Sequence, residues 1–218
     1  MKKQHLVILS GVILVLLFVL GSFIYKNQQA KKLGFLSQEH AEVFVRGHSQ
    51  TLGNDAAKVY LVEFMDPACE TCSAFSPFVK KLMEENPDKI KLVLRYAPFH
   101  DGADYFVRIL EAAKKQGKYW ETLDVMYRSQ PYWASHHNPQ PELIWQFLPS
   151  AGLDLGKLSK DMSDPAIDEI IRQDLADAKT LNVTKTPGFF VNGKPLVVFG
   201  YQQLQQLLES EIAVNYPK

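Results

Sequence analysis

The chain has 218 residues, of which 46% are hydrophobic, and its 24 basic side chains balance 24 acidic ones. This length and apolar content predict a single domain with a sizeable core, which follows a short N-terminal apolar segment in the chain. The sequence shows no basic patch and no glycine-rich phosphate loop, so we expect no nucleic-acid partner.

Residues 1–25 are predicted to be a cytoplasmic start followed by a transmembrane signal anchor. Residues 6–25 are uncharged, and twenty residues at ~1.5 Å each match a bilayer core of about 30 Å. A cleaved signal peptide is the alternative, but its apolar core is usually about 7–15 residues and ends in an A-x-A-like site. Lysines flank both ends of the run, so they do not fix its orientation. Residues 26–57 are predicted to be a stem.

The rest of the chain is organised around residues 59–72. An apolar run over 59–65 predicts a buried strand, Asp66-Pro67 ends it, and a helical pattern begins at Cys69. The unpaired N–H groups of a helix start stabilise a thiolate, so the pKa of Cys69 should fall below the free value of about 8.5. Cys72, about one turn further on, is positioned to attack a mixed disulfide formed at Cys69.

Two other roles for a C-x-x-C pair are weaker. A zinc site would need two more ligands, yet the chain has no third cysteine and no histidine at a finger-like spacing. A structural disulfide closing so small a loop would remove little entropy from the unfolded chain. The spacing therefore favours a redox-active pair without a metal or other cofactor.

The elements after the helix indicate an α/β fold. Residues 58–100 form its predicted first half, with a second strand over 90–96, and residues 182–218 form its second half. Between them, residues 101–181 are helical in pattern and are predicted to be an inserted helical domain. Strands are expected over 188–191 and 195–199, joined by the hairpin signal Asn192-Gly193. The pair His136-His137 in this insertion is read as a loop and not as a metal site.

With the cysteines, this order of elements and Thr184-Lys185-Thr186-Pro187 in view, the chain resembles thioredoxin-fold proteins of the DsbA-like thiol:disulfide oxidoreductase family. The resemblance covers about residues 45–215. It implies that Cys69 is the exposed nucleophile and Cys72 the buried resolving cysteine.

The resemblance also assigns roles outside the C-x-x-C pair. Pro187 corresponds to the cis-proline that faces the disulfide, and the backbone of Thr186 to a surface that pairs with a substrate strand. Glu63 corresponds to a buried acid that relays protons, and burial should raise its pKa. The alternatives are an outward-facing carboxylate at Glu63 and an ordinary trans proline at Pro187.

One departure from the family concerns the residues between the cysteines. The strongly oxidising members carry Pro-His there, whereas this chain carries Glu70-Thr71. Threonine offers only a hydroxyl to a thiolate, and the carboxylate of Glu70 repels it. We therefore expect a less oxidising couple than in the strongest members.

The sequence predicts an enzyme that exchanges disulfides outside the cytoplasm, anchored in a bacterial inner membrane with its catalytic domain on the periplasmic or outer side. Its expected partners are unfolded or reduced exported proteins and a DsbB-type membrane reoxidase. Two alternatives remain open: a disulfide isomerase or reductase kept reduced by a membrane donor, and a copper-binding or assembly module that uses the thiols as soft ligands.

Overall fold

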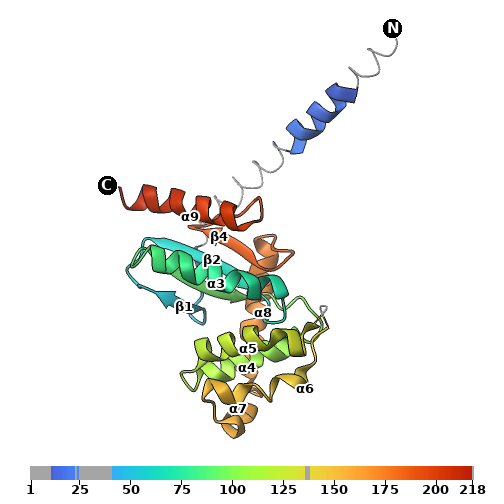
Figure 1. Ribbon diagram of the computed structural model, residues 1–218, viewed down its shortest axis with the longest axis vertical. Coiled ribbons are helices and arrows are strands. Elements are labelled where there is room, and N and C mark those ends of the chain that lie inside the picture. Colours follow the sequence, from blue (N-terminus) through green and yellow to red (C-terminus); the bar gives the residue numbers. More distant parts are fainter. Residues whose placement is uncertain (1–10, 23, 25–40, 136–137, 218) are drawn as a thin grey trace.

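The computed structural model describes residues 11–22, 24, 41–135 and 138–217. Residues 11–22 are helical, and the N-terminal end of this helix points away from the rest of the molecule (Figure 1). The elements that follow are α2 Ala41–Phe44, β1 Gln50–Gly53, β2 Val59–Met65, α3 Glu70–Glu85, β3 Ile90–Tyr96, α4 Ala103–Lys114, α5 Tyr119–Trp133, α6 Pro141–Ile144, the 3-10 helix η2 Leu148–Ala151, α7 Leu155–Asp161, α8 Pro165–Thr180, β4 Gly188–Val191, β5 Lys194–Pro195 and α9 Tyr201–Asn215.

The five strands form one mixed sheet in the order β1-β3-β2-β4-β5. The central strand β2 runs parallel to β3 and antiparallel to β4. The edge strands β1 and β5 are each antiparallel to their neighbour. The predicted strand–helix–strand unit is therefore confirmed. The hairpin turn is confirmed as well, because Asn192 and Gly193 both have positive φ, 47° and 77°, as a two-residue type I′ turn requires.

Side chains of β2 alternate between two hydrophobic cores, one on each face of the sheet. Leu61 and Met65 belong to the larger core, which includes α3, α9 and the helices inserted after β3. Val62 and Phe64 belong to the smaller core, together with residues of α2 and α8. Glu63 has the parity of Leu61 and Met65, so it points to the face covered by α3.

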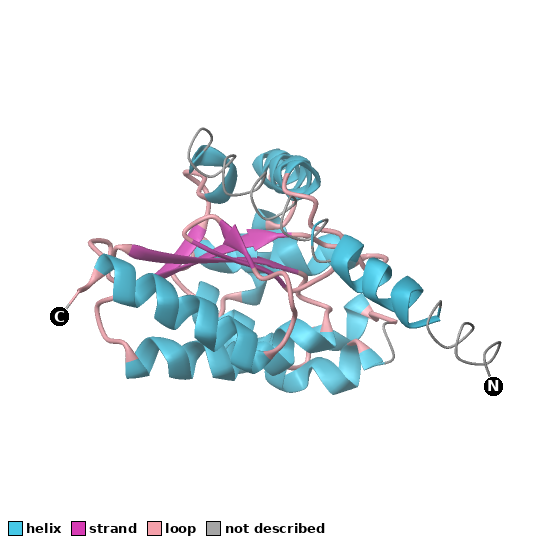
Figure 2. Ribbon diagram, turned by 90° about the horizontal axis from the view of Figure 1, so that it is seen from above, coloured by secondary structure: helices cyan, strands magenta, loops and turns pink. Residues whose placement is uncertain are grey.

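Helices cover both faces of the sheet (Figure 2). On the larger face, α3 packs against α9 through aromatic rings, with the Phe75 and Tyr201 centroids 4.1 Å apart and nearly parallel. Helices α4 to α8 lie between β3 and β4 in the chain, and α4 to α7 gather at the end of the molecule opposite α9 (Figure 1). The helix α8 contacts both α4 and β3, so it connects this helical block to the sheet.

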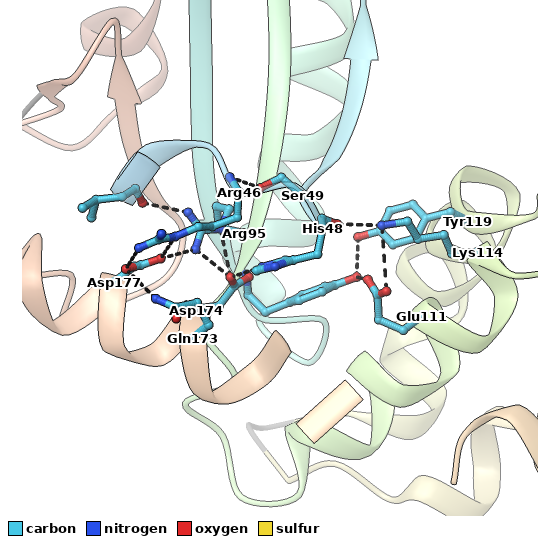
Figure 3. Close-up of polar contacts among 12 residues, drawn as sticks. Arg46, His48, Ser49, Arg95, Glu111, Lys114, Tyr119, Gln173, Asp174 and Asp177 are labelled. Atoms are coloured by element: carbon cyan, nitrogen blue, oxygen red, sulfur yellow. Dashed lines mark hydrogen bonds and ion pairs between the residues drawn. The ribbon is translucent and has the colours of Figure 1, made fainter. Parts of the chain in front are cut away.

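A buried cluster of charges holds α8 and the segment before β1 to the sheet (Figure 3). Arg95 of β3 is 0% exposed and donates to Asp174 at 2.6 and 2.9 Å and to Asp177 at 2.6 Å. Arg46 binds both oxygens of Asp177, at 2.8 and 2.9 Å, and His48 Nε2 lies 2.6 Å from Asp174. Burying so many charges is tolerable only because each finds a partner of opposite sign.

Two expectations about element boundaries were wrong. The stem predicted over 26–57 is too long, because Gln50–Gly53 pairs with β3 and α2 packs on the smaller core. The strand predicted over 195–199 ends at Pro195. Beyond it Val197, Val198 and Phe199 are 44–55% exposed, so their β-branched and aromatic character reflects an apolar loop and not a paired strand.

The N-terminal predictions are tested only in part. Residues 6–10, 23 and 25–40 lie outside the described residues, as does His136-His137. Within the part of the chain that the structure describes, no helix combines the length and the apolar content needed to cross a bilayer.

Candidate active site

Cys69 lies at the N-cap of α3, immediately after the turn that leaves the central strand. Its backbone is extended, with φ −75° and ψ 117°, and its carbonyl accepts the first helical hydrogen bond, from Ser73 N at 3.1 Å. The turn is closed by Cys69 N donating to the Asp66 carbonyl at 3.0 Å. The predicted placement of Cys69 at the helix start is therefore confirmed.

The surroundings of Cys69 favour its thiolate. The hydrogen bond from the Cys72 thiol, followed by those from the Thr186 side chain and the backbone of Cys72 and Thr71, lowers the pKa of Cys69 to about 6, although burial opposes the shift. Cys69 is only 5% exposed, with its sulfur 3.4 Å from the Thr186 carbonyl oxygen. Cys69 is therefore nearly buried and not exposed as expected, with the Thr186 carbonyl among the groups that contact its sulfur.

Cys72 lies in the first turn of α3 and is completely buried. Burial, followed by the hydrogen bond to Cys69 and the charges of Glu63 and Cys69, raises its pKa well above the usual value. The two thiols therefore differ in the sense that disulfide exchange requires: one is a stable thiolate near neutral pH, and the other stays protonated.

Glu63 is 4% exposed on the α3 side of β2. Burial raises its pKa to about 8, with a smaller contribution from the negative charge of Cys69. The alternative of an outward-facing carboxylate is excluded. A carboxyl group with this pKa can hold or release a proton near neutral pH, which is what a relay between Cys72 and solvent needs.

The Thr186–Pro187 peptide bond is cis, so the alternative of a trans proline is excluded. These residues immediately precede β4, which pairs with β2. This pairing brings Thr186 into contact with Cys69, although the two are far apart in sequence. The structure therefore unites the C-x-x-C turn and the cis-proline segment in one site.

Glu70 and Thr71, between the cysteines, are exposed. Thr71 lines a groove of about 990 Å³ together with Thr186, Pro187, Phe190, Leu196 and Phe199, and the N-terminal helix contributes Phe18, Gly21 and Ser22 to the same groove. The groove is largely apolar and includes the cis-proline segment, as a surface for an extended substrate segment would.

Sequence reasoning missed three polar residues that hold the cysteine turn. Asp66, read only as a strand terminator, is fully buried and accepts hydrogen bonds on both oxygens. His100 contacts it at 2.7 Å, and Gln130 of α5 donates to the Pro67 carbonyl at 3.0 Å. Only the position of Asp66, three residues before Cys69, could have drawn attention to it.

Residues 46–210 match the family model described as Thioredoxin. The chain belongs to this family. The match includes both cysteines, Glu63 and the Thr186–Pro187 segment, and it extends from the charged cluster before β1 into α9.

Several known proteins are similar to much of the chain. The probable disulfide bond formation protein D of Bacillus anthracis is 27% identical, over 97% of this chain and 99% of that protein. A thioredoxin-like oxidoreductase from Silicibacter pomeroyi has 28% identity and a TM-score of 0.67, covering 78% of this chain and 96% of the other. An Na(+)/H(+) antiporter NhaA of Herminiimonas arsenicoxydans is 31% identical over 66% of this chain, which spans only 22% of the antiporter.

These findings confirm the predicted thioredoxin-like α/β fold and the predicted family, the DsbA-like thiol:disulfide oxidoreductases. Thiol:disulfide oxidoreductase is accordingly the enzyme class of the chain. The direction of the exchange, the role of each residue and the cellular location are separate questions.

Proposed function

We propose that this protein donates disulfides to reduced exported proteins through Cys69 and Cys72. The observation that carries the proposal is the asymmetry of the two thiols beside the cis-proline segment: the pKa of Cys69 is lowered to about 6 while that of Cys72 is raised. A thiolate that is stable at neutral pH is a good leaving group, and disulfide donors release their cysteine in that form.

In the oxidising half-cycle, a substrate thiolate attacks Cys69 of the Cys69–Cys72 disulfide, and Cys72 leaves and takes up a proton. A second substrate thiolate then attacks the substrate sulfur of the mixed disulfide and expels Cys69 as a thiolate. The substrate loses two electrons and two protons, and the cysteine pair gains the electrons. Glu63, beneath the pair, supplies the proton to Cys72, and a quinone-linked membrane reoxidase of the DsbB type removes the electrons afterwards.

The substrate is held as an extended segment. Thr186 offers its backbone for strand addition, and the apolar groove beside it takes the neighbouring side chains of an unfolded chain. Glu70 and Thr71 are exposed beside the cysteines, and Thr71 lines the groove, so we infer that these two residues tune the reduction potential of the pair. The lowered pKa of Cys69, about 6, lies above the lowest values of about 3.5 known for such thiols. This supports a reduction potential below those of the most oxidising members of the family.

We propose further that the enzyme acts at the outer side of a bacterial inner membrane, anchored by residues 6–25. Large apolar side chains from Val12 to Leu20 are 47–76% exposed on the described helix. A continuous exposed apolar surface of this kind is suited to lipid, and disulfides persist outside the cytoplasm.

The test is oxidation of a dithiol peptide by the purified full-length protein, with C69S as the variant. We expect wild type to oxidise one peptide per protein disulfide and C69S to oxidise none. Oxidation by C69S at the wild-type rate would refute the assignment. The reduction potential in glutathione buffers then gives the direction: a value near or above about −180 mV supports donation, whereas one near about −270 mV supports a reductase or isomerase.

A further inference from the structure

Asp66 makes more hydrogen bonds than ending a strand requires. Its Oδ1 accepts from Ala68 N at 2.8 Å, inside the turn that carries Cys69. Its Oδ2 accepts from Phe99 N at 2.8 Å, His100 N at 2.9 Å and His100 Nδ1 at 2.7 Å. One buried carboxylate thus joins the cysteine turn to the segment that follows β3.

Only a carboxylate fits this arrangement. Backbone N–H groups donate to both oxygens, one to Oδ1 and two to Oδ2, and an ionised carboxyl group is an acceptor on both oxygens. An asparagine would place an NH₂ group against at least one backbone N–H, whichever way its amide were oriented. The side chain is 0% exposed, and a buried carboxylate is retained only where hydrogen bonds replace those that it would make with water.

The backbone of Asp66 contacts both cysteines of the redox pair. Its carbonyl accepts from Cys69 N at 3.0 Å, and its backbone is among the groups that hydrogen-bond Cys72. Gln130 of α5 fixes the opposite side of the same turn through Pro67 O. The turn is therefore clamped between the sheet side and the inserted helices by groups that do not depend on the oxidation state of either sulfur.

We propose that Asp66 and His100 are positioning residues of the redox site, which hold the Cys69 turn in one geometry while Cys69 exchanges its sulfur partner. This inference rests on the proposed use of Cys69 and Cys72. When Cys69 is bonded to a substrate or to glutathione, the thiol pair no longer holds the turn. The Asp66–His100 pair then keeps Cys72 in line for attack and keeps the N–H groups of Thr71 and Cys72 directed at Cys69.

The experiment compares H100A with H100N in the reduced full-length protein. The asparagine amide can place an N–H where His100 Nδ1 lies, whereas alanine removes that donor. Oxidised glutathione is the probe: the Cys69 thiolate attacks it and releases one glutathione thiolate, and Cys72 then displaces the second to form the Cys69–Cys72 disulfide. Rapid acid quenching and alkylation resolve the two steps. Thiolate absorbance against pH gives the titration of Cys69.

We expect H100A to slow the second step about tenfold and to raise the midpoint of the thiolate titration above the wild-type value of about 6. H100N should restore both. D66N should slow the second step at least as much as H100A. D154A is the control for a general loss of stability. It removes the N-cap of α7, away from the site, and should change neither the rate of the second step nor the thiolate titration.

If H100A titrates and resolves glutathione as wild type does, the pair is merely structural and the inference is refuted. The same holds if H100N fails as H100A does, since the hydrogen bond would then not be what matters. Should D66N not fold, the two His100 variants still decide the question. A wild-type protein that never forms the Cys69–Cys72 disulfide with glutathione would instead refute the proposed function.

Discussion

Cys69 and Cys72 have the same chemistry and are separated by only two residues, yet their surroundings shift their pKa values in opposite directions. The difference comes from position on α3. The hydrogen bond from the Cys72 thiol contributes most to lowering the pKa of Cys69 at the start of the helix, with smaller contributions from the backbone of Cys72 and Thr71, whereas Cys72 itself is buried in the core. Glu63 adds a third titrating group beneath them, so protons and electrons can move together in one small volume.

Glu63 should reduce stability at neutral pH. Burial raises its pKa from 4.5 to about 8 in the folded chain, so the unfolded chain releases the proton first, and stability falls as pH rises between these values. We expect E63Q to raise the free energy of unfolding at pH 7 by about 1–3 kcal/mol and to have little effect near pH 4. Urea unfolding at the two pH values measures this.

The same substitution should slow proton-dependent chemistry at Cys72. The fraction of Glu63 that is ionised near neutral pH can accept the Cys72 proton, and glutamine cannot, so in E63Q Cys72 should attack the glutathione mixed disulfide at least about tenfold more slowly. The matched control is E211Q, since Glu211 is equally buried but binds Lys194 at 2.6 Å. E211Q should lose stability at pH 7 and keep the Cys72 rate. A stability loss in E63Q would contradict the buried, protonated acid.

At the scale of elements, the periodicity of apolar residues predicted the strands and helices that have a regular local pattern. The strands at 59–65, 90–96 and 188–191 and the helix after Cys69 are where the sequence placed them, because each has a regular alternation or helical spacing. The edge strand β1 was missed because Gln50–Gly53 is short and polar, and its pairing with β3 depends on a partner about forty residues away.

Buried charges were the other failure of sequence reasoning. The helical spacing predicts that α8 faces inward with Ile167, Ile170, Ile171, Leu175 and Ala178. Three of these residues are buried, whereas Ile170 and Leu175 are only partly buried. Asp174 and Asp177 lie on the same buried face, where a pattern of apolar residues alone would not place carboxylates. Their partners Arg46 and Arg95 come from distant segments, and no local rule indicates such pairing.

The attachment of the segment before β1 to α8 should weaken at low pH. Burial would raise the pKa of Asp177, but the hydrogen bonds from Arg46 and Arg95 outweigh it and lower the pKa below 3.8. This pairing therefore stabilises the fold above that value and is lost as pH falls below it. We expect R46Q to reduce the free energy of unfolding at pH 7 by about 1–2 kcal/mol, and by less at pH 3.

Unfolding in urea at both pH values tests this. The control is R172Q on the exposed face of α8, where Arg172 pairs with Glu169 in solvent; it should not change stability measurably. An R46Q effect that is equal at pH 7 and pH 3 would show that the arginine acts through packing and not through its charge.

At the scale of the whole molecule, a rigid redox fold is combined with an apolar N-terminal segment. The fold joins a turn from the sheet, a cis-proline segment from more than a hundred residues later and a block of helices from the insertion. Only the first of these is visible as a local motif. The resemblance to the DsbA-like family supplied the rest, since the family preserves the arrangement in space.

The proposed anchor predicts how the full chain distributes in a bacterium. We expect the protein to sediment with membranes and to resist carbonate extraction. An L14R/L17R double variant should be retained several-fold less, because an arginine at the centre of a span costs about 2.5–3.5 kcal/mol. Q28R, beyond the apolar run, is the control and should behave as wild type. Wild-type protein in the supernatant would contradict the anchor.

The central position of β2 has a consequence for how the protein opens. β2 is hydrogen-bonded along both edges, to β3 and to β4, while the outermost strands β1 and β5 have only four and two residues. Fraying therefore begins at the outer strands, and the base of the catalytic turn comes loose only when the whole sheet melts. The outer strands can therefore open and close during many catalytic turnovers while the central strand that carries the catalytic turn stays paired.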